Sequence, residues 1–176
     1  MADTFFGLAV VGPNGGKATI IATSVNGVQF NFLNGCDVNP ISREVVFTDA
    51  GQTFDISHDG SFVLFSETTN NRLLKYRLKE KTTEVFLNLT TQPLKIKRAP
   101  TFGEFWLAAN DIVLQPRSLK PFGYKFKLFG QLLLTKNLQL QYNNTQVNVL
   151  QEYPVNGGTL SIGSRDASYV GIFRKW

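Results

Sequence analysis

The sequence predicts an all-β protein built from a repeated hairpin. Three segments combine an apolar strand, a tight polar turn containing glycine, and a second strand rich in Phe, Trp, Leu and Val: Phe54–Phe65, Leu94–Leu107 and Val149–Ile162. Their turns contain Gly60, Gly103 and Gly157, which are 43 and 54 residues apart. A period of roughly 40 to 50 residues with four strands per unit is typical of a β-propeller blade. Helical periodicity is weak everywhere, so strands are expected along the whole chain.

The expected strands follow one another as hairpins. The first pair turns at Pro13-Asn14-Gly15-Gly16, where residues tolerate a positive φ, and a fainter copy turns at Pro40-Ile41-Ser42-Arg43. In order, the strands are Phe5–Val11, Lys17–Val25, Phe30–Val38, Glu44–Asp49, Phe54–Ser57, Phe62–Glu67, Arg72–Leu78, Thr83–Leu89, Leu94–Arg98, Glu104–Ala109, Tyr124–Phe129, Gln131–Leu138, Val147–Tyr153, Thr159–Gly163 and Val170–Arg174. The segment Ala108–Leu119 lacks strand character, and its Pro116 favours a loop.

Length and composition suit one folded domain over residues 1–176, with 43% hydrophobic and 18% charged residues. No stretch approaches the roughly 20 apolar residues of a membrane span. The net charge of +5 comes from Lys and Arg that alternate with apolar residues. This alternation is typical of a solvated strand face, so we expect no nucleic-acid partner. The single Cys36 excludes an internal disulfide and is expected to be a small buried hydrophobe.

The N-terminal segment is predicted to be a strand and not a secretory signal. Asp3 stands where a signal peptide carries positive charge, and the apolar run ends at once at Gly12-Pro13. Two glycosylation sequons begin at Asn88 and Asn143, and they have meaning only in a secreted chain.

Several segments resemble the plant strictosidine synthase family and its strictosidine synthase-like relatives. They cover most of the chain in the order of the family: Phe6–Gly16, Ala22–Phe30, Val46–Asp49, Ser57–Glu67, Asn71–Tyr76, Ile96–Arg98 and Gly103–Leu107. The resemblance implies a six-bladed β-propeller with a small-molecule pocket at the mouth of the central channel. It also implies a vacuolar or secretory location, and either condensation of tryptamine with secologanin or ester and lactone hydrolysis of the calcium-dependent paraoxonase type.

Compared with the family, the chain is expected to be an incomplete propeller with about three and a half blades' worth of strands. It starts well inside the family's blades, and only seven residues separate Asp49 from Ser57, where relatives carry two further strands. An inner strand near Val45–Phe47 is therefore expected to have an unpaired edge. We expect either a homo-oligomer that completes the propeller or an open, aggregation-prone arc.

The family's catalytic residue also differs. In the synthases a Glu in the last blade acts as the general base, and its position corresponds to Asn148, with Gln146 in place of a nearby His. An amide cannot accept the proton. Glu152 lies four residues further along the strand, roughly 13 Å away, and Glu67 is a second weak candidate. We expect Asn34, Gln146 and Tyr153 to line the pocket.

The hydrolase alternative requires about six to eight oxygen ligands around a calcium ion. Gln52, Leu94 and Lys95 occupy positions where such ligands are needed, and the plausible ligands that remain are Asn34, Asp49 and Glu67. We therefore expect no metal and no cofactor.

Nucleophilic catalysis has little support. His58 lies in a turn and is predicted to serve that turn, and Trp106 is predicted to be core. Two classes of function stay open: a small-molecule enzyme of plant specialised metabolism, or a catalytically silent binding or interaction module or truncated gene product.

Overall fold

The computed structural model describes residues 1–49, 53–115, 117–155 and 158–174. Within these ranges the chain forms eighteen strands and one 3₁₀ helix, η1 (Thr68–Asn70), which confirms the all-β prediction. No helix of the described chain has the length and hydrophobicity needed to cross a membrane.

Two four-stranded antiparallel sheets form the centre of the molecule. Each strand pairs with the next one in sequence, so each sheet is a simple meander. The first sheet contains β8 (Phe54–Ile56), β9 (Phe62–Glu67), β10 (Arg72–Arg77) and β11 (Thr82–Asn88). The second contains β12 (Gln92–Arg98), β13 (Glu104–Leu114), β14 (Arg117–Lys127) and β15 (Leu132–Asn137).

Four smaller sheets flank these two. On the N-terminal side are β1 (Ala2–Asp3), β2 (Gly7–Val10) and β3 (Thr19–Ala22), then the hairpin β4 (Ser24–Val25) and β5 (Val28–Gln29), then the pair β6 (Leu33–Val38) and β7 (Val45–Asp49). On the C-terminal side are β16 (Val149–Tyr153), β17 (Thr159–Gly163) and β18 (Gly171–Arg174). The described strands are more numerous, and spread over more sheets, than three and a half four-stranded blades would require.

The predicted strand Lys17–Val25 is divided in the structure. Its first part pairs with β2 as β3, whereas Ser24–Val25 pairs with β5. The turn between β4 and β5 contains Asn26 and Gly27, both with positive φ, which is the geometry that a tight two-residue hairpin requires. Because of this turn, Ser24 and Val25 pair with β5 and not with β2.

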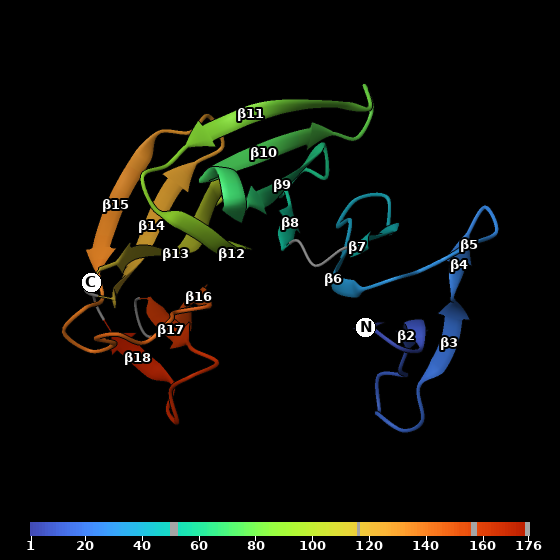
Figure 1. Ribbon diagram of the computed structural model, residues 1–176. Coiled ribbons are helices and arrows are strands. Elements are labelled where there is room, and N and C mark those ends of the chain that lie inside the picture. The colour runs from blue at the N-terminus through green and yellow to red at the C-terminus, as the bar shows by residue number, and fades with distance from the viewer. Residues whose placement is uncertain (50–52, 116, 156–157, 175–176) are drawn as a thin grey trace.

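The first strands of five sheets, here called the inner strands, form a row. Among them β1 contacts β6, β6 contacts β8, β8 contacts β12, and β12 contacts β16. Figure 1 shows the sheets following one another in an arc around an open centre, from β2 and β3 at one end to β16–β18 at the other.

From the pair β6–β7 onward, consecutive sheets pack face to face through apolar cores. Phe62, Leu64, Ile96, Phe105 and Phe126 are buried between the two four-stranded sheets. The next core joins the second of these sheets to β16–β18 and includes the predicted core residue Trp106, which is fully buried. Burying one large apolar side chain contributes roughly 1.5 to 3 kcal/mol, so these cores fix the order of the sheets along the arc.

The predicted loop at Ala108–Leu119 is wrong. β13 continues to Leu114 and β14 starts at Arg117, so the two strands form a long hairpin in which Asn110 pairs with Pro121 and Ile112 with Leu119. The backbone pairing between β13 and β14, which extends from Glu104 to Leu114, outweighs the local preference of a proline for a loop. Pro116, on which that prediction relied, lies outside the described residues.

The sheet β6–β7 contains only two strands within the described chain. β7 pairs with β6 on one side. Its other edge borders an apolar groove of about 500 Å³ lined by Val46, Phe47, Thr48, Asp49, Phe54, Val63, Phe65, Tyr76 and Leu78. β8 begins five residues after Asp49, and this interval is too short to hold two outer strands. The predicted unpaired edge is confirmed for the described part of the chain.

Cys36 on β6 corrects another prediction. Its side chain is exposed and not buried. Cys36 and Val38 border a space of about 400 Å³ that lies between β6 and the strands β2 and β3.

Candidate functional site

Asn148, which the resemblance places at the family's catalytic position, anchors a loop. It precedes β16, and its backbone N–H donates to the carbonyl of Gly163 at 2.9 Å. Its side-chain Oδ1 accepts a hydrogen bond from the backbone N–H of Arg165 at 2.7 Å. The carboxamide oxygen therefore holds the residues that follow β17 close to the start of β16.

The segment around Gln146 is fixed by a buried asparagine of the neighbouring sheet. Asn110 on β13 donates from Nδ2 to the carbonyl of Val147 at 3.2 Å and accepts at Oδ1 from the Val147 N–H at 3.2 Å. Asn110 is almost fully buried, so this reciprocal pair replaces a strand partner for Val147. Gln146 itself is half-buried.

The other two expected pocket residues lie elsewhere. Tyr153 is the last residue of β16 and is exposed. It follows Val149 by four residues, about 13 Å along an extended strand, so Gln146 and Tyr153 flank opposite ends of β16. Asn34 is an exposed residue near the start of β6.

Glu152 belongs to an ion-pair network between sheets. Its carboxylate accepts a hydrogen bond from Trp106 Nε1 at 2.7 Å and lies 3.0 Å from Lys125 Nζ. Lys125 also lies 2.8 Å from Glu104. Burial lowers the pKa of Lys125, but its hydrogen bonds to Glu104 and Glu152 outweigh that effect and raise it. These contacts join β13 and β14 to β16, so Glu152 is held as a structural acceptor.

Glu67 is similarly engaged at the edge of the molecule. It pairs with Arg72 across the β9–β10 hairpin and accepts from Asn70 Nδ2 at 2.7 Å. The hydrogen bonds from Arg72 and Asn70 lower the pKa of Glu67.

His58 joins two hairpin turns, as a turn residue would. Its Nδ1 accepts from the backbone N–H of Gly103, and its Nε2 lies 2.9 Å from the carbonyl of Ala99. The ring also packs against Phe102 and Phe105. Both ring nitrogens therefore serve the contact between β8–β9 and β12–β13.

A charged cluster that the sequence did not reveal joins three inner strands. It consists of Asp37 on β6, Asp55 on β8 and Arg98 on β12. The guanidinium of Arg98 lies 2.9 Å from Asp37 Oδ2 and 3.1 Å from Asp55 Oδ1. The backbone N–H of Arg98 donates to Asp55 Oδ2 at 2.8 Å. The one sequence signal was a carboxylate between two apolar residues, Phe54-Asp55-Ile56, since such a position in a strand is commonly buried and paired.

Asp55 is the most perturbed member of this cluster. Only 2% of the residue is exposed. Burial and a hydrogen bond with Asp37 raise the pKa of Asp55 to about 7, although Arg98, Lys97 and the Arg98 N–H act in the opposite direction.

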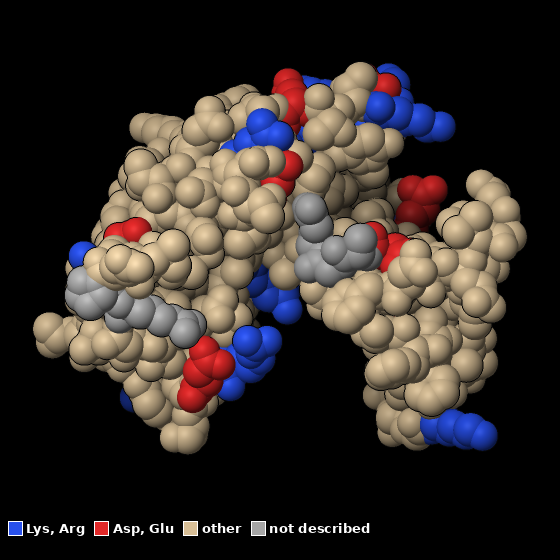
Figure 2. All heavy atoms as spheres, viewed as in Figure 1, with Lys and Arg blue, Asp and Glu red and all other residues tan. Residues whose placement is uncertain are grey.

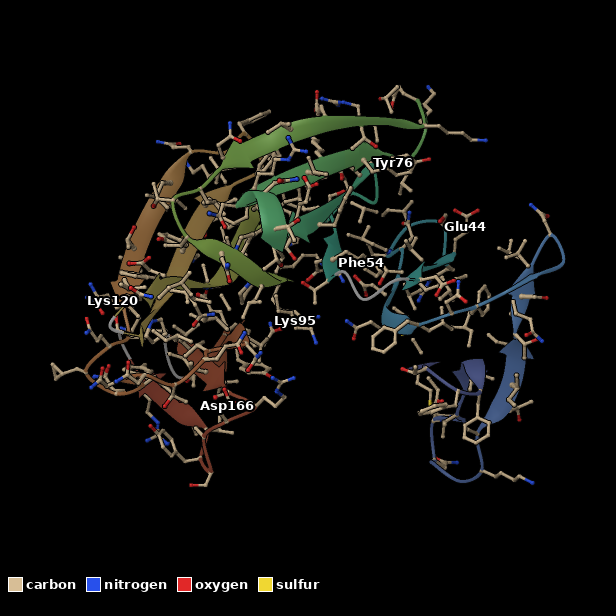
Figure 3. All side chains as sticks on the ribbon, viewed as in Figure 1. Glu44, Phe54, Tyr76, Lys95, Lys120 and Asp166 are labelled. Atoms are coloured by element: carbon tan, nitrogen blue, oxygen red, sulfur yellow. The ribbon has the colours of Figure 1, made fainter. Side chains whose placement is uncertain are left out.

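One lysine of β12, Lys95, faces the open centre of the arc. Figure 3 shows Lys95 pointing from β12 into this space, and Figure 2 shows a notch between the two ends of the arc with Lys or Arg atoms along one wall. Partial burial and the neighbouring Lys97 lower the pKa of Lys95.

Oxygen-rich metal ligation finds little support at this centre. Among the described residues no three His, Cys, Asp or Glu side chains come together to hold a metal ion. Gln52 lies outside those residues. A site without metal stays a prediction.

Comparison with known proteins gives one consistent family, although no family model matches the chain. Protein STRICTOSIDINE SYNTHASE-LIKE 12 of Arabidopsis thaliana is 29% identical over 99% of this chain and 64% of its own length. Protein STRICTOSIDINE SYNTHASE-LIKE 11 of the same plant is 29% identical over 99% and 65%, respectively. Strictosidine synthase of Catharanthus roseus is 30% identical over 98% of this chain and 61% of its own length.

The chain spans less than two thirds of the length of these relatives. The similarity nevertheless runs along almost all of its residues. The segments on which the resemblance was based occupy paired strands and the turns between them in the all-β structure. The chain belongs to the strictosidine synthase-like family.

Proposed function

We propose that the sheets are blades of an incomplete β-propeller. The support is the unbroken row of inner strands, β1, β6, β8, β12 and β16, together with the face-to-face packing of consecutive sheets. In a propeller the first strand of each blade lines the central channel, and the following strands lie further out. The open centre in Figure 1 then corresponds to the channel, and the exposed Lys95 lies on its wall.

We further propose that this chain binds a small molecule at the channel mouth without condensing an amine with an aldehyde. One observation supports the proposal: the Oδ1 of Asn148, which the resemblance places at the position of the catalytic Glu, is occupied by the Arg165 N–H. A carboxamide has no useful basicity, so the proton of the substrate amine has no acceptor there. Glu152 does not replace it, because Trp106 and Lys125 already hold that carboxylate.

The test compares binding with turnover. The purified chain is incubated with tryptamine and secologanin, and the product is measured by mass spectrometry. Binding is followed by the rise in melting temperature, because a ligand that binds only the folded chain stabilises it by RT ln(1 + [L]/Kd). We expect a rise with millimolar ligand and no product. Product formed by the unmodified chain would overturn the proposal of a silent site, and no rise with either ligand would overturn binding of these compounds.

A matched pair of variants extends this test. Asn148→Glu restores a carboxylate at the catalytic position and is expected to give at most a trace of product, because it also loses the acceptor for the Arg165 N–H in its present geometry. Asn143→Glu places the same charge on an exposed turn and is expected to give none. If both variants give equal product, position 148 is not the site of the base.

An interaction module is the second candidate. β7 pairs only with β6 among the described strands, and an apolar groove adjoins its other edge; both favour an interaction module, since an unprotected edge strand pairs readily with another strand. In this proposal a second copy of the chain supplies strands that complete the propeller.

A further inference from the structure

We propose that Asp37, Asp55 and Arg98 form a proton-operated joint: a proton on Asp55 holds the inner strands β6, β8 and β12 together, and its loss weakens their contact. The proposal concerns the arrangement of the sheets and is independent of any ligand at the channel mouth.

The cluster occupies the place where three sheets meet. Asp37 and Arg98 are 61 residues apart in sequence, and Asp55 and Arg98 are 43 apart. Asp37 also accepts from the backbone N–H of Ile56 at 3.4 Å, which ties β6 directly to β8. Beyond the cluster, Gln151 on β16 donates to the Arg98 carbonyl at 3.5 Å. A change in the charge of this cluster therefore acts on several sheets at once.

One oxygen of Asp55 shows why a proton fits here. Asp55 Oδ1 is buried and makes no hydrogen bond, although it lies 3.1 Å from Arg98 Nε. A buried carboxylate oxygen without a donor is costly, whereas a protonated oxygen donates its hydrogen to a neighbouring acceptor. The adjacent carboxyl of Asp37 is such an acceptor.

The charged groups around Asp55 come from two elements. β6 supplies Asp37. β12 supplies Arg98, which contacts Asp55 directly, and also Lys97 and Lys95, which act on Asp55 from further away. The third element, β9, places the apolar Leu64 opposite Asp55. With Asp55 protonated, the guanidinium of Arg98 is balanced by Asp37 alone. With Asp55 ionised, two carboxylates share that guanidinium in a buried site, which is unfavourable.

The direction of the pH effect follows from linkage. The pKa of Asp55 rises from 3.8 to about 7 on folding, so the folded chain binds a proton that the unfolded chain has released between these values. The stabilisation is complete below the unfolded value and is lost as the pH rises through about 7. Asp59 and Glu67, whose pKa values are lowered, act oppositely in acid. The stability of the chain is therefore compared at about pH 6.0 and about pH 8.5, which lie on either side of the raised pKa of Asp55 and above the acid range in which Asp59 and Glu67 titrate.

The experiment measures melting temperature at these two pH values. For the wild-type chain we expect a fall of roughly 3 to 6 °C between them, because about one pKa unit separates pH 6.0 from the folded pKa of about 7 in a chain of this size. Asp55→Asn mimics the protonated acid, because its amide donates to Asp37 and accepts from the Arg98 N–H. This variant is expected to melt within about 2 °C at both values. Asp111→Asn, on β13 and outside the cluster, is the matched control and is expected to keep the wild-type fall.

A second measurement locates the effect. Hydrogen exchange of the Arg98 amide, corrected for its intrinsic pH dependence, is expected to lose protection at pH 8.5 in the wild-type chain but not in Asp55→Asn. A wild-type melting temperature that does not fall would overturn the proposal, as would the same fall in Asp55→Asn. If Asp55→Asn does not fold, Asp37→Asn decides: it removes a group that raises the pKa of Asp55, so the fall must move to lower pH, and an unchanged fall overturns the joint.

Discussion

Replacing Lys125 with methionine leaves two partly buried carboxylates without the ammonium group that both now contact. Lys125 Nζ lies 2.8 Å from Glu104 and 3.0 Å from Glu152, and the three side chains are between 12% and 15% exposed. Methionine keeps the length and apolar stem of the side chain, so the substitution changes mainly the charge. The network joins β13 and β14 to β16, and the loss is therefore expected to weaken the packing of the C-terminal sheet.

The magnitude follows from the burial of the pair. Removing one partner of a buried ion pair costs about 3 to 5 kcal/mol, because the other charge stays desolvated. For a chain of this size each kcal/mol shifts the melting temperature by about 2 to 4 °C. Lys125→Met should therefore melt roughly 6 to 20 °C below the wild-type chain. Lys127→Met, on the same strand but exposed, should lie within about 4 °C of it, since a surface charge contributes at most about 1 kcal/mol.

The assay is thermal unfolding followed by circular dichroism for the wild-type chain and both variants. A double variant, Lys125→Met with Glu152→Gln, should recover part of the loss, because it removes one unpaired charge and leaves an acceptor for Trp106 Nε1. If Lys125→Met melts within about 2 °C of Lys127→Met, the network does not stabilise the fold and the reasoning is wrong.

Two further predictions concern metal and assembly. Millimolar calcium should leave the melting temperature unchanged, because Leu94 and Lys95 stand where oxygen ligands are needed; a rise of several degrees that a chelator reverses would demonstrate a site. Light scattering at micromolar concentration should show dimers or larger species, because the edge of β7 is unpaired in the described chain, and Val45→Lys should reduce them by protecting that edge. A monodisperse wild-type monomer would contradict the second prediction.

The hairpins were predictable because their signals are local. The turns at His58-Asp59-Gly60 and at Pro40–Arg43 lie between paired strands, as expected, since alternation of apolar residues and turn chemistry act over a few neighbouring residues. β16 and β17 pair on either side of the turn predicted at Asn156-Gly157-Gly158, of which Asn156 and Gly157 lie outside the described residues. A prediction from local signals alone was wrong at Ala108–Leu119, where a proline suggested a loop but the strands continue.

The candidate site was predictable only in part. The resemblance placed Asn148 at the family's catalytic position, but sequence could not show that its side chain holds the loop at Arg165. Sequence also left the role of Glu152 open, because Trp106 and Lys125 reach it from β13 and β14 of another sheet.

Local patterns in the sequence are enough to establish that this chain is all-β, that its strands form hairpins, and that too few residues follow Asp49 to form two outer strands. Which charged side chains meet depends on the tertiary packing. Asp37, Asp55 and Arg98 come from three sheets and show no common spacing, because their contact depends on how the inner strands pack. Burial at that junction raises the pKa of Asp55 to about 7, since the loss of water disfavours its charged form.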